Sequence, residues 1–279
     1  MPELPEMQAL AERVQVALVG RSVAAVDPLG FSALKTVSPT PGDLVGLRVT
    51  EVGRRGKFLM ITLEHHVRIL IHLSQAGRLD IETTAKSTRP KGSVVRIRFD
   101  NGSAILVREF GSQRKAGWWL LATDDDGPLA SLGPEPHDEA FAGALMNGDS
   151  NRHIHTLLRD QRTVAGIGRG YTDDVLNAVG ISPFTSLRRL SSEQRTALVT
   201  AVRTVLDQAL ELERRRSGGL SESKLGLRFA VHNRAGQPCP RCGQPLLRVS
   251  YESHEIVYCK DCQTNGRTLA DRRLSRLLR

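Results

Sequence analysis

The sequence predicts an α+β protein in which an N-terminal helix and an antiparallel β-sandwich precede a helical domain and a small cysteine-rich hairpin. Three observations support this order. Short alternating apolar segments fill residues 22–121, helical periodicity dominates from residue 138, and all four cysteines lie between residues 239 and 262. The 279 residues are also enough for two domains.

The N-terminal domain is expected to begin with an amphipathic helix. Apolar residues recur at helical spacing from Met7 to Leu18, with Pro5 near the start and Gly20 just beyond the end. Strands are expected next, in residues 47–64 and 67–82 and in a hairpin around Asn101-Gly102, a dipeptide typical of two-residue turns. We place this domain at residues 1–122 and interpret the acidic, turn-rich residues 123–136 as an interdomain linker.

Helical patterns define a second domain at residues 137–230. They lie near residues 138–146, 151–160, 172–179 and 191–213. The glycine-containing turn that ends at Arg169 leads into the third of these helices, so its backbone N–H groups can face a phosphate. A cysteine-rich hairpin is expected at residues 231–263, with strands at 246–249 and 255–258, and a basic tail at residues 264–279.

The charge balance points to a phosphate-rich partner. Thirty-nine Lys and Arg residues against thirty Asp and Glu residues leave a formal charge of +9, which is typical of surfaces that bind nucleic acid. The alternative is that the charge only keeps the protein soluble. The chain contains no run of apolar residues long enough to span a membrane and does not begin like a signal peptide, so we expect a cytoplasmic protein without a membrane partner.

The four cysteines predict a metal site. Cys239 and Cys242 form one Cys-x-x-Cys pair, Cys259 and Cys262 form a second, and sixteen residues separate the pairs. This spacing is typical of tetrahedral zinc bound by four thiolates, a set that leaves no open position for substrate. We therefore expect one structural Zn²⁺. Two redox-active dithiols are the alternative, but no thioredoxin-like βαβ pattern surrounds the cysteines.

The first residues carry the candidate chemistry. Removal of Met1 would expose Pro2 as a secondary amine that is partly unprotonated near neutral pH and able to attack the C1′ carbon of a sugar. Glu3 and Glu6 could move protons beside that nitrogen, since Glu6 lies one helical turn further on. The alternative is that Pro and Glu only start a helix.

Six short motifs accompany the cysteine hairpin along the chain. They are Pro2-Glu3-Leu4-Pro5-Glu6, Arg54-Arg55-Gly56-Lys57, His72-Leu73-Ser74-Gln75-Ala76-Gly77, Arg108-Glu109-Phe110-Gly111, Leu132-Gly133-Pro134-Glu135-Pro136 and Gly166-Ile167-Gly168. Together with the hairpin, these motifs resemble those of the formamidopyrimidine-DNA glycosylase and endonuclease VIII family, over nearly the whole chain. The resemblance implies an N-terminal helix with a β-sandwich, a helix-two-turn-helix domain and a zinc finger. It also implies base-excision repair of damaged duplex DNA by a monomeric, nucleoid-associated bacterial enzyme that is both a glycosylase and an abasic-site lyase.

The resemblance also implies roles for individual residues. Pro2 would be the nucleophile, Glu3 the main general acid and base, Glu6 a supporting carboxylate, and Lys57 a cation that contacts the DNA backbone. Members of this family flip the damaged nucleotide out of the duplex and fill the gap with three wedge side chains. Arg108 and Phe110 occupy two wedge positions, and Gln75 occupies the third, where Met is usual.

Other DNA contacts also depart from the family pattern. Arg169 replaces an Asn that contacts phosphate, and His254 replaces an Arg of the finger. Arg169 could still grip a phosphate, whereas a neutral His254 offers one donor in place of a charged fork. His155 replaces a Lys, and Glu109 replaces an Arg, which would bring a negative charge near the DNA.

Three hypotheses for the function follow from these residues. The first is a bifunctional glycosylase and lyase that uses an N-terminal proline Schiff base. The second is a damaged-DNA-binding protein with reduced catalysis, motivated by the altered positions Gln75, Glu109, His155, Arg169 and His254. The third is a zinc-ribbon regulator without a role in repair, which leaves the N-terminal motif unexplained.

Overall fold

The chain forms two structural units. The computed structural model describes residues 1–110, 114–216, 228–251 and 254–270. The N-terminal unit comprises Met1–Ser131 together with the end of helix α5 (Ser192–Arg215) from Leu210, and the C-terminal unit comprises Leu132–Ala209 and the C-terminal region. Among the residues in these ranges, no helix is long and apolar enough to cross a membrane.

Helix α1 (Leu4–Leu18) confirms the amphipathic helix expected from the sequence. Pro5 lies in its first turn, and Glu3 caps it in a capping box with Glu6. Its apolar face is buried, including Val14 and Leu18, and packs against strands β2 (Val49–Arg55) and β3 (Phe58–Leu63). The helix start is therefore held firmly by both local hydrogen bonds and packing.

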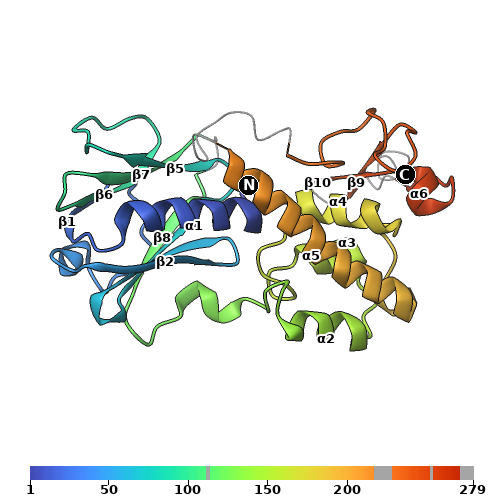
Figure 1. Cartoon of the computed structure of the whole chain (residues 1–279), viewed down its shortest axis with the longest axis horizontal. Helices are drawn as coiled ribbons and strands as arrows, with labels where there is room; N and C mark the ends of the chain where they lie inside the picture. Colours follow the sequence, from blue (N-terminus) through green and yellow to red (C-terminus); the bar gives the residue numbers. More distant parts are fainter. Residues whose placement is uncertain (111–113, 217–227, 252–253, 271–279) are drawn as a thin grey trace, which may run out of the picture. The chain divides into compact units, whose positions relative to one another are not determined.

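Two four-stranded antiparallel sheets form the rest of the N-terminal unit (Figure 1). One has the order β2-β3-β4-β8, and the other has the order β1-β6-β7-β5. The expected hairpin is confirmed, since β6 and β7 are joined at Asn101-Gly102 with Gly102 at a φ of +80°. The remaining strands and short helices are β1 (Val23–Pro28), η1 (Pro41–Leu44), η2 (Glu64–His66), β4 (Arg68–His72), β5 (Gly77–Glu82), β6 (Ser93–Phe99), β7 (Ala104–Glu109), β8 (Gly117–Leu121) and η3 (Gly127–Ser131).

Alternation along the strands sorts side chains between the core and the outer faces. In β3, Leu59, Ile61 and Leu63 are buried while their neighbours are partly exposed. Strands β6 and β7 are buried at most positions. There, the Arg96 guanidinium is only 2% exposed and pairs with Glu82 at 3.1 Å. Both sheets thus contribute to the core, as the α+β prediction requires.

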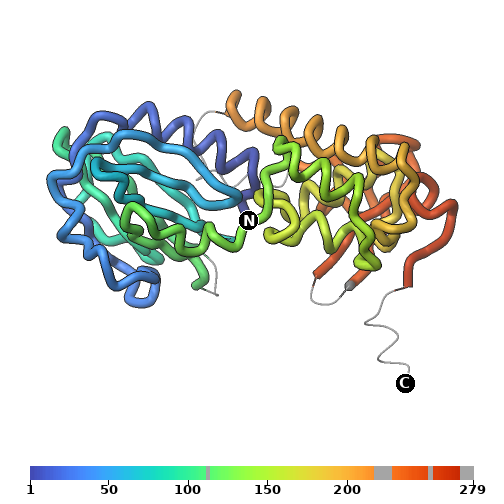
Figure 2. Tube along the Cα trace, turned by 90° about the horizontal axis from the view of Figure 1, so that it is seen from below, coloured from blue at the N-terminus to red at the C-terminus, as the bar shows by residue number. Residues whose placement is uncertain are grey.

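The C-terminal unit is built on a group of helices, seen in the green to orange part of Figure 2. Their positions follow the expected helical patterns. Gly168 caps α4, and Gly170 in its first turn lies against Phe229, whose ring would stand 2.1 Å from an added Cβ. The elements are α2 (Glu139–Asn147), α3 (Ile154–Arg159), α4 (Arg169–Val179), η4 (Leu187–Arg189) and α5 (Ser192–Arg215).

The cysteine-rich segment forms the expected hairpin. It consists of β9 (Leu247–Tyr251) and β10 (His254–Tyr258), followed by α6 (Lys260–Thr264). Buried Val231, Leu246 and Val257 pack with Cys239 and Cys259 in one apolar cluster. Past α6, the Leu269 N–H donates to the Tyr258 hydroxyl at 2.8 Å, and residues 271–279 of the expected basic tail lie outside the described residues.

Candidate active site and metal centre

The residues predicted to carry the chemistry lie at the buried start of α1. Pro2, Glu3 and Glu6 are all buried. The Glu3 N–H donates to the Glu6 carboxylate at 2.7 Å, and the Glu3 side chain accepts from the Glu6 backbone. These residues therefore do start a helix, as the alternative interpretation of the sequence expected. The same hydrogen bonds also hold the Glu3 and Glu6 carboxylates in place at the helix start that follows Pro2.

Lys57 lies in the turn between β2 and β3. Its side chain is 4% exposed, and Gly56 before it has a φ of +57°. The Arg54 Nε donates to the Gln8 side chain at 3.0 Å, which attaches this turn to α1. Lys57 is therefore a largely buried cation on an element tied to the helix of Pro2.

His72 is a neighbour of Lys57, and the sequence alone predicted no role for His72. It ends β4, pairs with Phe58 across the sheet, and its ring lies 4.9 Å from the Phe58 ring. Burial and the nearby Lys57 charge lower the pKa of His72 to about 4. The imidazole is therefore neutral at neutral pH and adds no charge to the site.

A tight turn presents Gln75, one of the three predicted wedge residues. Ser74 has a φ of +54°, and the Gly77 N–H donates to the Leu73 carbonyl at 2.8 Å. A Cβ at Gly77 would stand 2.1 Å from that carbonyl oxygen, so only glycine fits there. Gln75 is exposed at the tip of this turn.

The other two wedge residues lie beside this turn. Phe110 follows β7, its N–H donates to the Ala76 carbonyl at 3.1 Å, and its side chain is 61% exposed. The Arg108 guanidinium carbon lies 5.0 Å from the centre of the Phe110 ring. The structure therefore brings the three positions close together, with Gln75 on the turn before β5, Arg108 near the end of β7 and Phe110 directly after it.

Glu109, between those two residues, faces the interior. It is 6% exposed, and its carboxylate accepts from the backbone N–H groups of Lys115 at 2.8 Å and Ala116 at 3.1 Å. The expectation that Glu109 brings a negative charge near DNA stays a prediction, but the carboxylate points into the N-terminal unit. The reason is strand alternation, since Glu109 points to the opposite side of β7 from Arg108.

In the C-terminal unit, His254 lies in a buried polar cluster. It is 5% exposed and stacks on His155, with ring centres 5.8 Å apart. Burial, and then the charges of Arg159, His155 and Arg169, lower the pKa of His254 to about 4. Because the ring is enclosed, the predicted contact of His254 with DNA stays a prediction that requires the ring to move.

Asp173 organises this cluster from the interior of α4. Its carboxylate accepts from His155 at 3.1 Å and lies 2.6 Å from His232 Nδ1. Although burial opposes it, hydrogen bonds from both imidazoles lower the pKa of Asp173. Arg169, at the first turn of α4, is partly exposed. Of the predicted DNA contacts in this unit, Arg169 is thus the more accessible.

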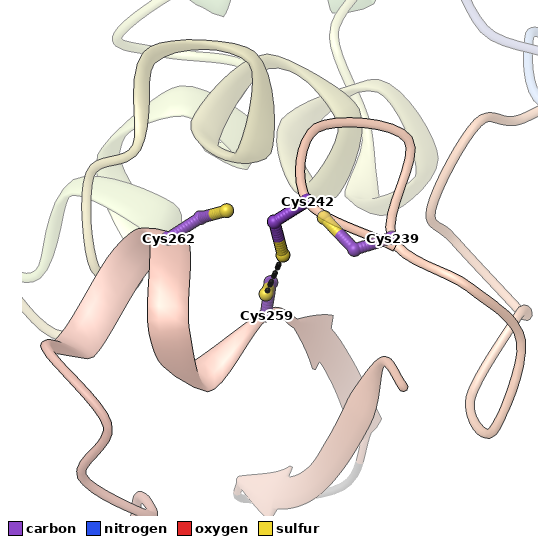
Figure 3. Close-up of side chains that lie close together, drawn as sticks. All are labelled: Cys239, Cys242, Cys259 and Cys262. Carbon is purple, nitrogen blue, oxygen red and sulfur yellow. Dashed lines mark hydrogen bonds between the residues drawn. The ribbon is translucent and has the colours of Figure 1, made fainter. Parts of the chain in front are cut away.

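The four cysteines gather at one point, as Figure 3 shows. Their sulfur atoms all lie within 4.8 Å of one another, and those of Cys242 and Cys259 are 3.5 Å apart. The edge of a tetrahedral four-thiolate zinc site, with Zn–S bonds of about 2.3 Å, is about 3.8 Å. The cluster can therefore hold a metal ion, which confirms the coarser part of the zinc prediction.

The chemistry of the cysteine cluster also fits a cation. Although burial opposes it, backbone N–H groups of Arg241 and Cys242 lower the pKa of Cys239 to about 7. Burial and the neighbouring sulfur atoms raise the pKa of Cys262 to about 12. Four thiolates at this spacing repel one another unless a positive ion lies between them.

Side chains of helices α4 and α6 form hydrogen bonds around the cysteine cluster. The Asn177 side chain donates to the Cys239 sulfur at 3.6 Å and to Gln263 at 3.1 Å. Gln263 accepts from the Cys259 N–H at 2.8 Å and donates to the Ile181 carbonyl at 2.9 Å. These hydrogen bonds anchor the hairpin to the helical part of the C-terminal unit.

Comparisons with known proteins agree over most of the chain. A family model of the formamidopyrimidine-DNA glycosylase N-terminal domain matches residues 1–119, and one of its H2TH domain matches residues 132–219. The chain is 33% identical to the formamidopyrimidine-DNA glycosylase of Thermus thermophilus, covering 95% of this chain and 100% of that protein. It is also 33% identical to that of Chloroflexus aggregans, covering 94% and 98%.

Solved structures show the same fold. The Fpg protein of Lactococcus lactis, in complex with DNA containing an N7-benzyl-Fapy-dG, has a TM-score of 0.84 at 24% identity and covers 94% of this chain and 100% of that chain. Another structure of the same protein, bound non-covalently to DNA with an abasic site, has a TM-score of 0.82 at 23% identity and covers 94% and 99%.

Proposed function

This chain belongs to the formamidopyrimidine-DNA glycosylase family, and we propose that it removes damaged bases from duplex DNA and then cleaves the abasic site. The observation that carries the proposal is the buried start of α1, where the capping box holds Glu3 and Glu6 beside Pro2. The turn of Lys57 is tied to the same helix through Arg54 and Gln8.

The proposed chemistry begins once Met1 has been removed. The Pro2 nitrogen attacks C1′ of the damaged nucleotide, the glycosidic bond breaks, and the base leaves with a proton from an acid, for which Glu3 is the candidate. The Pro2 nitrogen loses its proton, and the sugar ring then opens as the C1′–O4′ bond breaks and O4′ takes up a proton, which leaves an iminium ion between Pro2 and C1′. This iminium ion makes a C2′ proton acidic. Loss of that proton expels the 3′ phosphate, and water then releases Pro2. Lys57 supplies a cation for the DNA backbone.

The wedge residues support recognition of the extrahelical nucleotide. Gln75 lies on the turn before β5, Arg108 lies near the end of the neighbouring strand β7, and Phe110, directly after that strand, is largely exposed. Side chains in these positions can fill the space that a flipped nucleotide leaves in the duplex. Gln75 adds a polar group where Met is usual, so we expect it to weaken stacking there.

We propose that the metal is one Zn²⁺ held by Cys239, Cys242, Cys259 and Cys262. When bound, it supplies the positive charge that four thiolates need and takes no part in the reaction. The chain's own residues position the hairpin through Asn177 and Gln263. Arg169 would contact phosphate at the start of α4.

The alternative of a damaged-DNA-binding protein with reduced catalysis receives no support from the comparisons, since the relatives named above are all glycosylases. Those relatives are bacterial proteins. We propose that this chain is likewise bacterial, and that it acts on DNA in the cytoplasm as a monomer. Size-exclusion chromatography with light scattering tests the monomer, and a mass near twice 30.6 kDa would contradict it.

Borohydride trapping tests the proposed chemistry. The iminium ion must be reducible, so borohydride should produce a covalent adduct between the protein and a duplex with an abasic site. An extra residue before Pro2 should abolish the adduct, and Glu3→Gln should reduce base excision more than DNA binding. Intact mass first shows whether Met1 has been removed. Trapping that persists in the extended protein would assign the nucleophile to another amine, with Lys57 the first to test.

A further inference from the structure

We propose that Asp80 is a positioning residue that holds the Arg108 guanidinium against the Phe110 ring, so that the two wedge side chains form one ordered block before DNA binds. This inference rests on the proposed function, because it concerns how the wedge meets a damaged duplex. Asp80 belongs to none of the motifs on which the family resemblance was based.

The contacts define a continuous arrangement of three side chains. The Arg108 Nε donates to the Asp80 carboxylate at 2.7 Å, and Arg108 Nη2 lies 2.5 Å from the same oxygen. The guanidinium carbon of the same side chain lies over Phe110, at 5.0 Å from the ring centre. Arg108 and Asp80 are 25% and 21% exposed, so water reaches the pair without surrounding it.

The strand register explains why a carboxylate is needed here. Arg108 of β7 stands directly opposite Arg78 of β5, and Asp80 is the diagonal neighbour on the same face. Two cations in directly opposite positions of a sheet repel each other. Asp80 offers Arg108 a charged acceptor, which keeps the guanidinium in one place despite Arg78.

A cavity beside Asp80 and Arg108 gives the Arg108 side chain room to move. A cavity of about 570 Å³ is lined by both Asp80 and Arg108, with Glu82, Thr84, Lys86 and Leu106 among its other walls. A long side chain next to an open cavity can adopt several rotamers. Without the Asp80 carboxylate, Arg108 has room to turn into this cavity and leave the Phe110 ring.

Ordering the wedge in the free protein favours binding of a damaged duplex in particular. Immobilising a side chain on binding costs affinity, and a side chain already held in place avoids that cost. A free Arg108 would therefore lower affinity for a duplex whose gap the wedge must fill, by about threefold to tenfold. Undamaged duplex, in which no gap is filled, would keep its affinity.

If Asp80 acted only through its negative charge, its removal would have the opposite effect on affinity for damaged DNA, so the two explanations can be distinguished. Asp80 carries a negative charge near a surface that binds a polyanion. If that charge were its only influence, Asp80→Ala would raise affinity for every DNA, damaged or not. The ratio of the dissociation constant for undamaged duplex to that for damaged duplex would then stay constant.

The experiment measures this ratio with a tetrahydrofuran abasic analogue and an undamaged duplex of the same sequence. We expect Asp80→Ala to lower the ratio by about threefold to tenfold, and Asp80→Asn, which keeps a neutral acceptor, to lower it less. The matched control is Asp27→Ala, which removes the partner of Arg98 at 3.0 Å in the same sheet and should leave the ratio unchanged. Thermal unfolding of each variant confirms that it folds.

A second arm tests whether Asp80 acts through Arg108. In an Arg108→Ala background, Asp80→Ala should have no further effect on the ratio. An unchanged or raised ratio in the single variant, or an equal decrease in the Arg108→Ala background, overturns the inference. The proposed function fails separately, in the unsubstituted protein, if borohydride trapping is absent or the abasic analogue is not preferred, and the inference then fails with it.

Discussion

The Glu109 carboxylate gives the sharpest test of how the structure departs from the family pattern. Arg is common at this position in the family, so Glu109→Arg would restore the family residue. In this chain, however, the carboxylate is 6% exposed and accepts two backbone N–H groups just before β8. An arginine there would bury a cation and direct its donors at other donors.

The expected loss of stability follows from these hydrogen bonds. A hydrogen bond to a charged group is worth about 1.5–3 kcal/mol, and an uncompensated buried charge costs about 3–5 kcal/mol. Glu109→Gln keeps one carbonyl acceptor and should lower the free energy of unfolding by about 1.5–3 kcal/mol. Glu109→Arg should lower it by about 3–5 kcal/mol, a large part of a domain's usual stability of about 5–15 kcal/mol.

Tryptophan fluorescence in urea is a suitable assay. Both tryptophans of the chain, Trp118 and Trp119, lie in β8, close in sequence to Lys115 and Ala116, whose backbone N–H groups donate to Glu109. The signal therefore reports the N-terminal unit alone. Glu51→Gln, an exposed substitution on β2, is the control and should change stability by less than about 0.5 kcal/mol. If Glu109→Arg is as stable as the unsubstituted protein and binds DNA more tightly, the inward position of Glu109 is refuted.

Three further predictions concern the metal, salt and pH. One zinc per chain should be found, and Cys242→Ser or chelation should abolish DNA binding by unfolding the hairpin; folded, DNA-competent protein without zinc would contradict this. Affinity for duplex DNA should fall steeply with salt. Truncation after Leu269 should reduce the slope of log affinity against log salt concentration by about 0.9 for each DNA phosphate that the removed residues neutralise, and an equal slope would show that these residues do not bind DNA. The truncation starts after Leu269 because one before Gln263 would remove an anchor of the hairpin. Stability should fall as the pH drops from about 6.5 towards about 4, because burial lowers the folded-state pKa of His72 and His254 to about 4 and the unfolded chain takes up these protons first. Urea unfolding at pH 7 and pH 5 measures this, and His72→Gln should reduce the difference.

Local signals predicted much of the fold correctly. The spacing from Met7 to Leu18 predicted α1, and Asn101-Gly102 predicted the β6–β7 hairpin, because both depend on residues that are close in the chain. The cysteine pairs predicted a cluster for the same reason, since each pair supplies two ligands from one turn.

Contacts between distant strands and helices could not be predicted in this way. The Asp80–Arg108 pair joins residues 28 positions apart and exists because β5 and β7 are neighbours in one register. Register between strands is set by packing of the whole sheet, which no short window of sequence contains. The inward position of Glu109 depends on side-chain alternation along the same strand, β7. The stacking of His254 on His155 depends on how β10 and α3 both pack against α4.

The altered positions therefore do not form one class. Glu109, His155 and His254 are each nearly enclosed, and each takes part in packing or in hydrogen bonds within its own unit. Only Gln75 and Arg169 remain accessible, and Arg169 still carries a positive charge at a helix N-terminus. The hypothesis of reduced catalysis treated all five positions as weakened binding to DNA, yet in three of them the new side chain packs or bonds inside the protein. The capping box at the start of α1 still joins Glu3 and Glu6, so these three substitutions change packing and hydrogen bonds elsewhere in the protein and leave the hydrogen bonds of the proposed catalytic carboxylates intact.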